Sequence, residues 1–263
     1  MINPIAFQIG GLEVRWYGLL IVLGILLAMA VASRNCKKYR VDTDHLLNIV
    51  LLIVPVGLIA ARLYYVIFNW SYYSANPSEI IAIWHGGLAI HGGIIGGALA
   101  MLVYCIVKKM PFRIMGDIIT PGVVLAQAIG RWGNFFNQEA YGSETTLPWA
   151  IYIDGAYRHP TFLYESLWDL AAFVILMLLW SKWGKRRRGD IMALYFILYS
   201  LGRVWIEWLR TDSLMIGDIK MAMLMSVAGV LLGIFFLVYN RLRPVTSYPT
   251  VKKTGNKNTK RKK

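Results

Sequence analysis

The chain has 263 residues, of which 57% are hydrophobic and only 16% are charged, and its mean hydropathy is +0.51. This composition excludes an ordinary soluble domain and is typical of an integral membrane protein. The formal net charge of +14 does not indicate nucleic-acid binding, because eight Lys and Arg residues follow Leu242 in one tail and most of the others lie in short loops. No nucleic-acid partner is therefore expected.

Seven apolar stretches have roughly the length that a membrane-spanning helix needs, about 20 residues. In chain order, these predicted spans cover about 17–33, 46–68, 88–107, 114–131, 161–180, 190–209 and 220–240. We therefore predict an all-α polytopic membrane protein with one seven-span domain over residues 1–240.

Two polar segments interrupt or follow this domain. Residues 132–160 are predicted as the longest external loop, in which LPWAIYID indicates a short strand and a small extracytoplasmic subdomain. The basic tail, 241–263, is predicted to be disordered, because it is polar, charged and poor in apolar residues.

The basic residues of the loops indicate the orientation of the domain. They follow the first, third, fifth and seventh spans, whereas the opposite loops contain only Arg158 and Arg210. Because cytoplasmic loops are enriched in Lys and Arg, the N-terminus is expected outside and the C-terminus inside the cell.

Several ionisable side chains lie inside or beside the apolar spans. They are Arg62, His91, Arg131, Glu139, Glu165, Arg203 and Glu207. Charged groups in a bilayer are costly and often mark a functional site. In the predicted orientation all of them lie toward the outer leaflet, so one polar chamber could contain them, while the inner halves of the spans are expected to be almost wholly apolar.

Structural interpretations remain open for four of these residues. Arg203 and Glu207 are four residues apart and can form an ion pair on one helix face. His91 lies among glycines at a spacing that is common on helix-packing surfaces. Arg62 can extend its side chain to the outer interface.

The densest polar run is GRWGNFFNQEAYG at residues 130–142. It resembles the signature G-R-x-G-N-x-x-N-x-E-x-x-G of the prolipoprotein diacylglyceryl transferase family, and every fixed position is present. Similar motifs follow one another along about residues 1–240: WYG (16–18), ARLYYV (61–66), HGG (91–93), RHPTFLYE (158–165) and GRVWIEWLR (202–210). Two positions differ, because Phe162 replaces a polar Gln, and Thr211 precedes Asp212 where the family often has Pro.

The resemblance implies a transferase of the bacterial cytoplasmic membrane whose active site faces outward. Such an enzyme moves the diacylglyceryl group of phosphatidylglycerol to the cysteine thiol in the lipobox of a prolipoprotein. The products are a thioether and glycerol phosphate, and this is the first step of bacterial lipoprotein maturation. The expected partners are phosphatidylglycerol, the lipobox segment and the lipid bilayer, and no metal or organic cofactor is expected.

The resemblance and the chemistry together predict roles for eleven residues. The predicted catalytic residues are His91, Arg131 and Arg203, with His91 as the base that accepts the thiol proton. Phosphatidylglycerol is predicted to contact Arg131, Asn134, Asn137, Glu139, Tyr17 and Arg62. Supporting roles are predicted for Glu207, Glu165 and Arg210. Alternatively, His91 positions the substrate and the arginines act through electrostatics.

Two other classes of function are compatible with the same polar set. A small-solute or lipid transporter would line a path with it, although no inverted repeat is evident and polar groups are not expected at the inner side. A lipid-binding or assembly protein without catalysis would use it for recognition alone.

Overall fold

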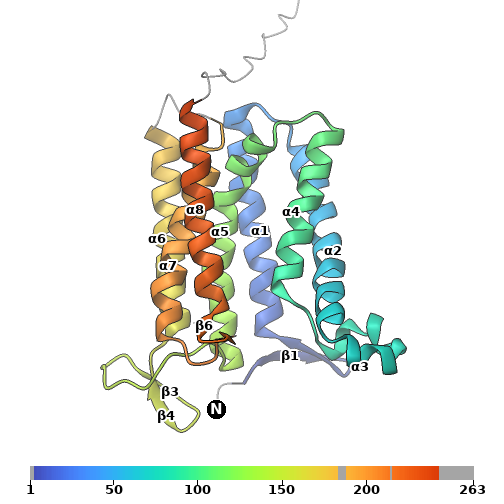
Figure 1. Cartoon of the computed structure of the whole chain (residues 1–263), viewed down its shortest axis with the longest axis vertical. Coiled ribbons are helices and arrows are strands. Elements are labelled where there is room, and N and C mark those ends of the chain that lie inside the picture. The colour runs from blue at the N-terminus through green and yellow to red at the C-terminus, as the bar shows by residue number, and fades with distance from the viewer. Residues whose placement is uncertain (1–2, 183–187, 214, 243–263) are drawn as a thin grey trace, which may run out of the picture.

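The structure is a computed structural model that describes residues 3–182, 188–213 and 215–242. Seven of its helices are long and apolar enough to cross a membrane, which confirms the all-α polytopic class. They are α1 (Trp16–Tyr39), α2 (Thr43–Phe68), α4 (Ile90–Val107), α5 (Phe112–Asn137), α6 (Thr161–Lys182), α7 (Asp190–Leu209) and α8 (Met221–Leu242). Their axes run side by side along the long dimension of the molecule (Figure 1). The predicted disorder of the tail falls on residues 243–263, which lie outside the described residues.

Some helices continue beyond the apolar stretches that predicted them. The first span was expected at 17–33, whereas α1 extends to Tyr39, and α5 extends to Asn137. Residues 132–137, expected at the start of the external loop, are therefore helical. A helix ends where its backbone hydrogen bonds end, and α5 ends at Asn137 because its C-cap residue, Gln138, adopts a left-handed conformation with φ of 53°.

Short elements gather at one end of the bundle, which we call the hairpin end (Figure 1). Three antiparallel hairpins pair β1 (Ile5–Ile9) with β2 (Leu12–Arg15), β3 (Ile151–Ile153) with β4 (Ala156–Arg158), and β5 (Met215–Ile216) with β6 (Ile219–Lys220). The helix α3 (Trp70–Ala75) and the 3₁₀ helices η1 (Pro77–Ile81) and η2 (Ile83–His85) precede α4. The strand predicted from LPWAIYID is confirmed as β3, and the turn Asp154–Gly155 that follows it has positive φ at both residues, as tight hairpins require.

The helix α5 forms the centre of the fold. It packs against α1, α6 and α7, while α2 packs against α4 and α8 against α7. Small residues allow the close approach of α1: a Cβ on Gly122 would come within 2.6 Å of the Ala28 carbonyl oxygen. The buried side chains around α5 include Met115, Ile118 and Leu176. The most buried span thus carries the signature run at its end.

The opposite end of the bundle, which we call the tail end, contains buried acids. Asp117 accepts hydrogen bonds from the Tyr39 hydroxyl (3.0 Å) and from the backbone N–H groups of Gly189 (2.7 Å) and Met192 (2.9 Å). Asp190 is also fully buried. The end that the sequence analysis takes as the inner one therefore contains two buried acids near the ends of its helices. Asp117 satisfies N–H groups at the start of α7, which would otherwise lack acceptors.

Candidate active site

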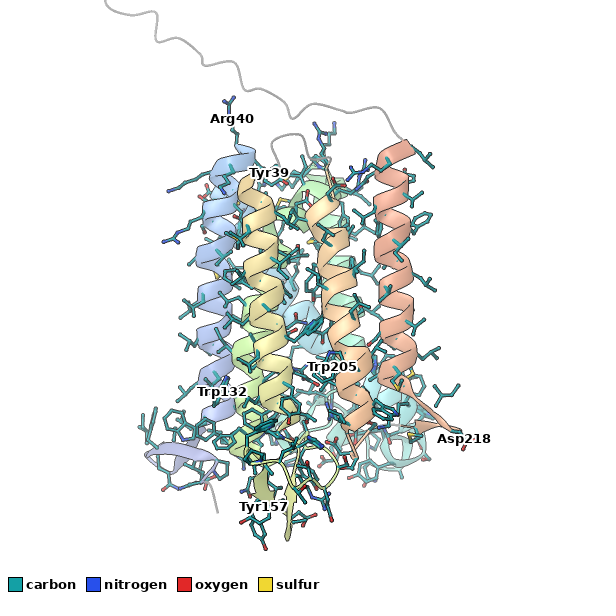
Figure 2. The ribbon with its side chains drawn as sticks, turned by 90° about the vertical axis from the view of Figure 1, so that its left-hand side faces the viewer. Tyr39, Arg40, Trp132, Tyr157, Trp205 and Asp218 are labelled. Carbon is teal, nitrogen blue, oxygen red and sulfur yellow. The ribbon has the colours of Figure 1, made fainter. Side chains whose placement is uncertain are left out.

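A buried carboxylate joins two arginines of neighbouring helices at the hairpin-end half of the bundle. Glu165 on α6 is only 3% exposed. Its Oε2 lies 2.5 Å from Nε of Arg131 on α5, and its Oε1 accepts a hydrogen bond from Nη1 of Arg203 on α7. Figure 2 shows Trp132 and Trp205, close in sequence to these arginines, well away from the tail-end residues Tyr39 and Arg40. Three helices thus contribute one charge each to a single contact.

The predicted pair of Arg203 and Glu207 is present and extends this contact. Nη2 of Arg203 lies 2.5 Å from Oε2 of Glu207, whose Oε1 accepts from the Ser213 hydroxyl at 2.6 Å. Nη1 of Arg210 lies 3.8 Å from Glu165 Oε1 and 3.9 Å from Glu207 Oε2. We call Arg131, Glu165, Arg203, Glu207 and Arg210 the arginine cluster. Buried charges persist in apolar surroundings when each one is paired in this way.

Arg210 connects the cluster to the residues that follow α7. Its Nε and Nη2 donate to the Asp212 carboxylate at 3.0 and 3.1 Å. Burial disfavours its charged form, but the hydrogen bond and charge of Asp212, followed by the charges of Glu165 and Glu207, raise the pKa of Arg210 above its ordinary value. Arg210 therefore stays protonated.

The signature run closes over the same end of the bundle. The side-chain amides of Asn134 and Asn137, on the last turn of α5, donate to Oε1 of Glu139 at 3.4 and 3.2 Å. The next residue, Ala140, has φ of 57°, and its N–H donates to Asp212 at 3.1 Å. Asp212 thus links the signature run to Arg210 of the arginine cluster.

Two glycines of the signature run permit close contacts. A Cβ on Gly133 would come within 2.3 Å of the ring of Tyr17, so this ring lies directly against the last turns of α5. A Cβ on Gly142 would lie 2.7 Å from Cβ of His159, whose carbonyl accepts the Gly142 N–H at 2.9 Å. The predicted headgroup residue Tyr17 is therefore brought beside the signature run.

His91 and Arg62 lie in a different part of the structure. His91 is the second residue of α4, and its ring lies 6.2 Å from that of Tyr64 on α2. Arg62 on α2 is 5% exposed and donates to backbone carbonyls of η1 and of the residues that precede α4. Within the described ranges, no hydrogen bond or ion pair joins either residue to the arginine cluster. Their predicted roles remain predictions.

A row of polar residues that the sequence analysis missed continues the cluster toward the middle of the bundle. Nη2 of Arg131 donates to the Tyr199 hydroxyl at 3.4 Å, and the Tyr195 hydroxyl donates to Oε1 of Gln127 at 3.2 Å. Gln127 precedes Arg131 by four residues, and Tyr195 precedes Tyr199 by four. This spacing, which places side chains on one helix face, was the signal available in the sequence.

Asp169 belongs to this missed row. It follows Glu165 by one helical turn and is 3% exposed. Its Oδ2 has no hydrogen-bond partner among the described residues, although Arg131 and Arg203 are near enough to interact with its charge. A buried carboxylate oxygen without a donor is rare and calls for an explanation.

Phe162, one of the two departures from the family motif, has an apolar environment. It is buried, and its ring centroid lies 5.5 Å from that of Trp132 and 5.0 Å from that of Phe135. The sequence therefore places an aromatic contact under the signature run where the motif has a polar side chain.

Metal binding has no visible basis here: in the part of the chain that the structure describes, no three His, Cys, Asp or Glu side chains are grouped so as to hold a metal ion. The chemistry available to the arginine cluster is that of paired guanidinium groups, which bind carboxylate or phosphate oxygens in bidentate fashion.

Comparisons with known proteins agree with this chemistry. The family model described as prolipoprotein diacylglyceryl transferase matches residues 4–239. The chain is 49% identical to the phosphatidylglycerol–prolipoprotein diacylglyceryl transferase of Clostridioides difficile, over 90% of this chain and 95% of that protein. Proteins with the same name from Clostridium novyi and Staphylococcus aureus are 46% and 49% identical, over 94% and 92% of this chain and 99% and 90% of their own lengths.

Proposed function

The chain belongs to the prolipoprotein diacylglyceryl transferase family, and from this we propose that it transfers the diacylglyceryl group of phosphatidylglycerol to the lipobox cysteine of a prolipoprotein at the arginine cluster. In this reaction a sulfur–carbon bond forms, the carbon–oxygen bond to the phosphate breaks, and the thiol gives up its proton. Glycerol phosphate leaves. The observation that carries the proposal is the buried Glu165 held between arginines of two helices.

Arg131 and Arg203 hold the phosphate of the lipid and stabilise it as it leaves. Glu165 contacts Arg131 at Nε. The other two nitrogens of Arg131 can therefore donate to a phosphate oxygen: Nη1, and Nη2, whose hydrogen bond to the Tyr199 oxygen is long at 3.4 Å. Charge accumulates on the phosphate as the carbon–oxygen bond breaks. Donors that are already in place stabilise this charge without reorganisation, which is usually the largest catalytic contribution.

The headgroup glycerol is bound by the signature run. Asn134 and Asn137 both point to the Glu139 carboxylate, so the three side chains offer donors and acceptors to neighbouring hydroxyls. Tyr17 borders the same place through Gly133. The acyl chains remain in the bilayer.

His91 accepts the proton of the lipobox thiol. A free thiol has a pKa of about 8.5, so only a small fraction is thiolate at neutral pH. Imidazole is mostly neutral there and can act as a base. His91 lies at the hairpin-end turn of α4, on the other side of the bundle from α6 and α7 (Figure 1). The peptide would therefore enter between α4 and the cluster.

The hairpin end faces outward in the bacterial cytoplasmic membrane. The excess of Lys and Arg at the tail end supports this orientation. Figure 2 shows Tyr157 and Arg40 at opposite ends of the molecule. A membrane-impermeant maleimide applied to intact cells should label Tyr157→Cys and spare Arg40→Cys until lysis. The native Cys36 and Cys105 are buried and should not react. The reverse labelling pattern would reject the orientation.

A mass shift tests the reaction itself. The purified protein is incubated in vesicles with phosphatidylglycerol and a lipobox peptide, and in parallel with the Cys→Ser peptide. A gain of one diacylglyceryl group on the cysteine peptide alone, lost with Arg131→Ala, is the expected result. Binding of lipid and peptide without any gain in mass would contradict the transferase and indicate a binding or assembly role.

A further inference from the structure

Arg62 is a buried cation whose hydrogen-bond acceptors are all main-chain carbonyls. Its Nε, Nη1 and Nη2 donate to five carbonyl oxygens: Ile80 (2.9 Å), Gly86 (2.6 Å), Gly87 (2.9 Å), Glu79 (2.5 Å) and Ala82 (3.3 Å). The guanidinium carbon also lies 5.2 Å from the centroid of the Tyr73 ring. A guanidinium has five N–H donors in a planar fork, and here each of its three nitrogens is engaged.

No acid in the described part of the chain forms an ion pair with Arg62. The nearest candidate in sequence is the Glu79 side chain, which lies 2.8 Å from Nδ1 of His85 instead. An arginine that held a phosphate would need donors directed to open space. The donors of Arg62 are directed to backbone carbonyls of η1 and of residues on either side of η2, so its contacts indicate a role in holding that segment.

The segment is shaped to fit the guanidinium. Gly86 and Gly87 have φ of 87° and 73°, values that side-chain-bearing residues rarely adopt. A Cβ on Gly87 would lie 2.4 Å from Nη1 of Arg62. A side chain at this position would be strained by the positive φ and would crowd Arg62 and the ring of Tyr65.

The same stretch of α2 continues to hold the chain up to His91. The N–H of Ala89 donates to the Ala61 carbonyl at 3.1 Å, one residue before α4 begins at Ile90. A Cβ on Gly92 would come within 2.4 Å of the Ala60 carbonyl oxygen. Residues 60–62 thus contact the backbone on both sides of His91.

We infer that Arg62 is a positioning residue that fixes the segment 79–91 against α2 and thereby sets the place of His91. The inference rests on the proposed function in that it takes His91 as the group that acts on the thiol. A displacement of about 1 Å in a reacting group can cost about 100-fold in rate, so a clamp on the residues that lead into α4 affects turnover without touching the substrate. Arg62 acts through the loop, in place of the direct lipid contact expected from the motif.

A double-mutant cycle tests whether Arg62 acts through His91. Arg62→Lys keeps the charge but loses the planar fork, and should lower kcat about 10-fold to 100-fold with little change in KM for the peptide. In a His91→Asn background the same change should cost no more than about twofold, because coupled sites are not additive. Arg113→Lys is the matched control: Arg113 also contacts a tyrosine ring, at 5.6 Å, but lies at the tail end. Losses that multiply in the double variant would overturn the inference.

Hydrogen exchange separates this inference from the role of His91. In Arg62→Lys, exchange should accelerate at the amides of residues 79–93 and not elsewhere, and in Arg113→Lys exchange in this segment should be unchanged. If His91→Asn turns over normally, the base assignment fails and exchange alone decides: faster exchange in this segment supports the clamp, and unchanged exchange overturns it.

A second variant changes the loop residue that contacts Arg62. Gly87→Ala places a methyl group against Arg62 and should reproduce both effects of Arg62→Lys. Its control is Gly155→Ala, because Gly155 has a similar φ of 80° but no heavy atom within 4 Å of its added Cβ. Equal effects of the two alanines would mean that backbone strain rather than the clamp is responsible, and would overturn the inference.

Discussion

Buried carboxylates lie at both ends of the bundle, and Asp117 at the tail end has different partners from the glutamates at the hairpin end. At the tail end, Asp117 accepts from backbone N–H groups of α7 and from the Tyr39 hydroxyl. At the hairpin end, Glu165 and Glu207 contact guanidinium groups. Backbone donors cannot leave without unravelling a helix, whereas a guanidinium can exchange one anion for another. We therefore expect Asp117 to support folding and the hairpin-end glutamates to support turnover. Asp190, the other buried tail-end acid, contacts Arg241 and Asn240 and falls outside this contrast.

Arg131→Lys should have the largest effect and should act on turnover alone. Lysine keeps the charge but cannot make two parallel hydrogen bonds, and it cannot hold Glu165 through Nε. We expect kcat to fall by about 10³-fold, the scale of removing a donor to a developing anion. Single-turnover assays with the lipobox peptide measure the fall, with folded protein quantified by gel filtration. An active Arg131→Lys enzyme would show that the fork geometry is dispensable.

Glu165→Gln should have the next largest effect. It removes the charge that Arg131 and Arg203 share while keeping the size of the side chain. The two guanidinium groups then repel each other and lose their common position, so kcat/KM should fall by about 100-fold. Glu144→Gln is the control, because Glu144 is exposed and its ion pair with Arg158 is long, at 3.7 Å. If both variants stay fully active, the charge of Glu165 has no part in turnover.

Asp117→Asn should reverse this pattern. The amide has one acceptor oxygen in place of two, so its NH2 group must face either the N–H of Met192 or the N–H of Gly189 together with the Tyr39 hydroxyl. We expect the free energy of unfolding to fall by about 2 kcal/mol, while kcat per folded molecule stays within about twofold, since the site is at the other end. Thermal unfolding in detergent and activity of the folded fraction measure the two quantities. If Asp117→Asn lost turnover but kept its full stability, the prediction would be wrong and Asp117 would have a part in the activity of the hairpin end.

Part of this contrast was predictable from the sequence. The length of the apolar stretches predicted the seven spans. Charged groups rarely persist in a bilayer without a partner, so the charged residues inside the spans, Arg131, Glu165, Arg203 and Glu207, could be predicted to lie together. The central place of Glu165 was not predicted. It depends on which faces of α5, α6 and α7 meet, and a single sequence gives spacing along a helix but not the rotation of neighbouring helices.

Main-chain partners were the least predictable feature. The five acceptors of Arg62 are backbone carbonyls, which every residue has, so the residue types in the sequence do not reveal which carbonyls accept its hydrogen bonds. The acceptor role of Asp117 toward Gly189 and Met192, more than 70 positions away, has the same origin. The β5–β6 hairpin has two residues per strand, too few for an alternating pattern.

Asp169→Asn should have the smallest effect and locates the boundary between the two kinds of acid. Asp169 lies one turn from Glu165 toward the middle of the bundle, and its Oδ2 has no hydrogen bond to lose within the described chain. The substitution removes the unfavourable burial of a carboxylate, which stabilises the fold, but it also removes the attraction of that carboxylate to Arg131. These two effects oppose each other. We therefore expect less than about 1 kcal/mol of change in unfolding free energy and less than about threefold in kcat. Leu167→Asn, on the exposed apolar face of the same helix, controls for placing an amide in α6. A fall in kcat of tenfold or more, about 1.4 kcal/mol, would contradict this expectation. It would mean that the charge of Asp169, one helical turn deeper than the arginine cluster, acts on Arg131 during turnover.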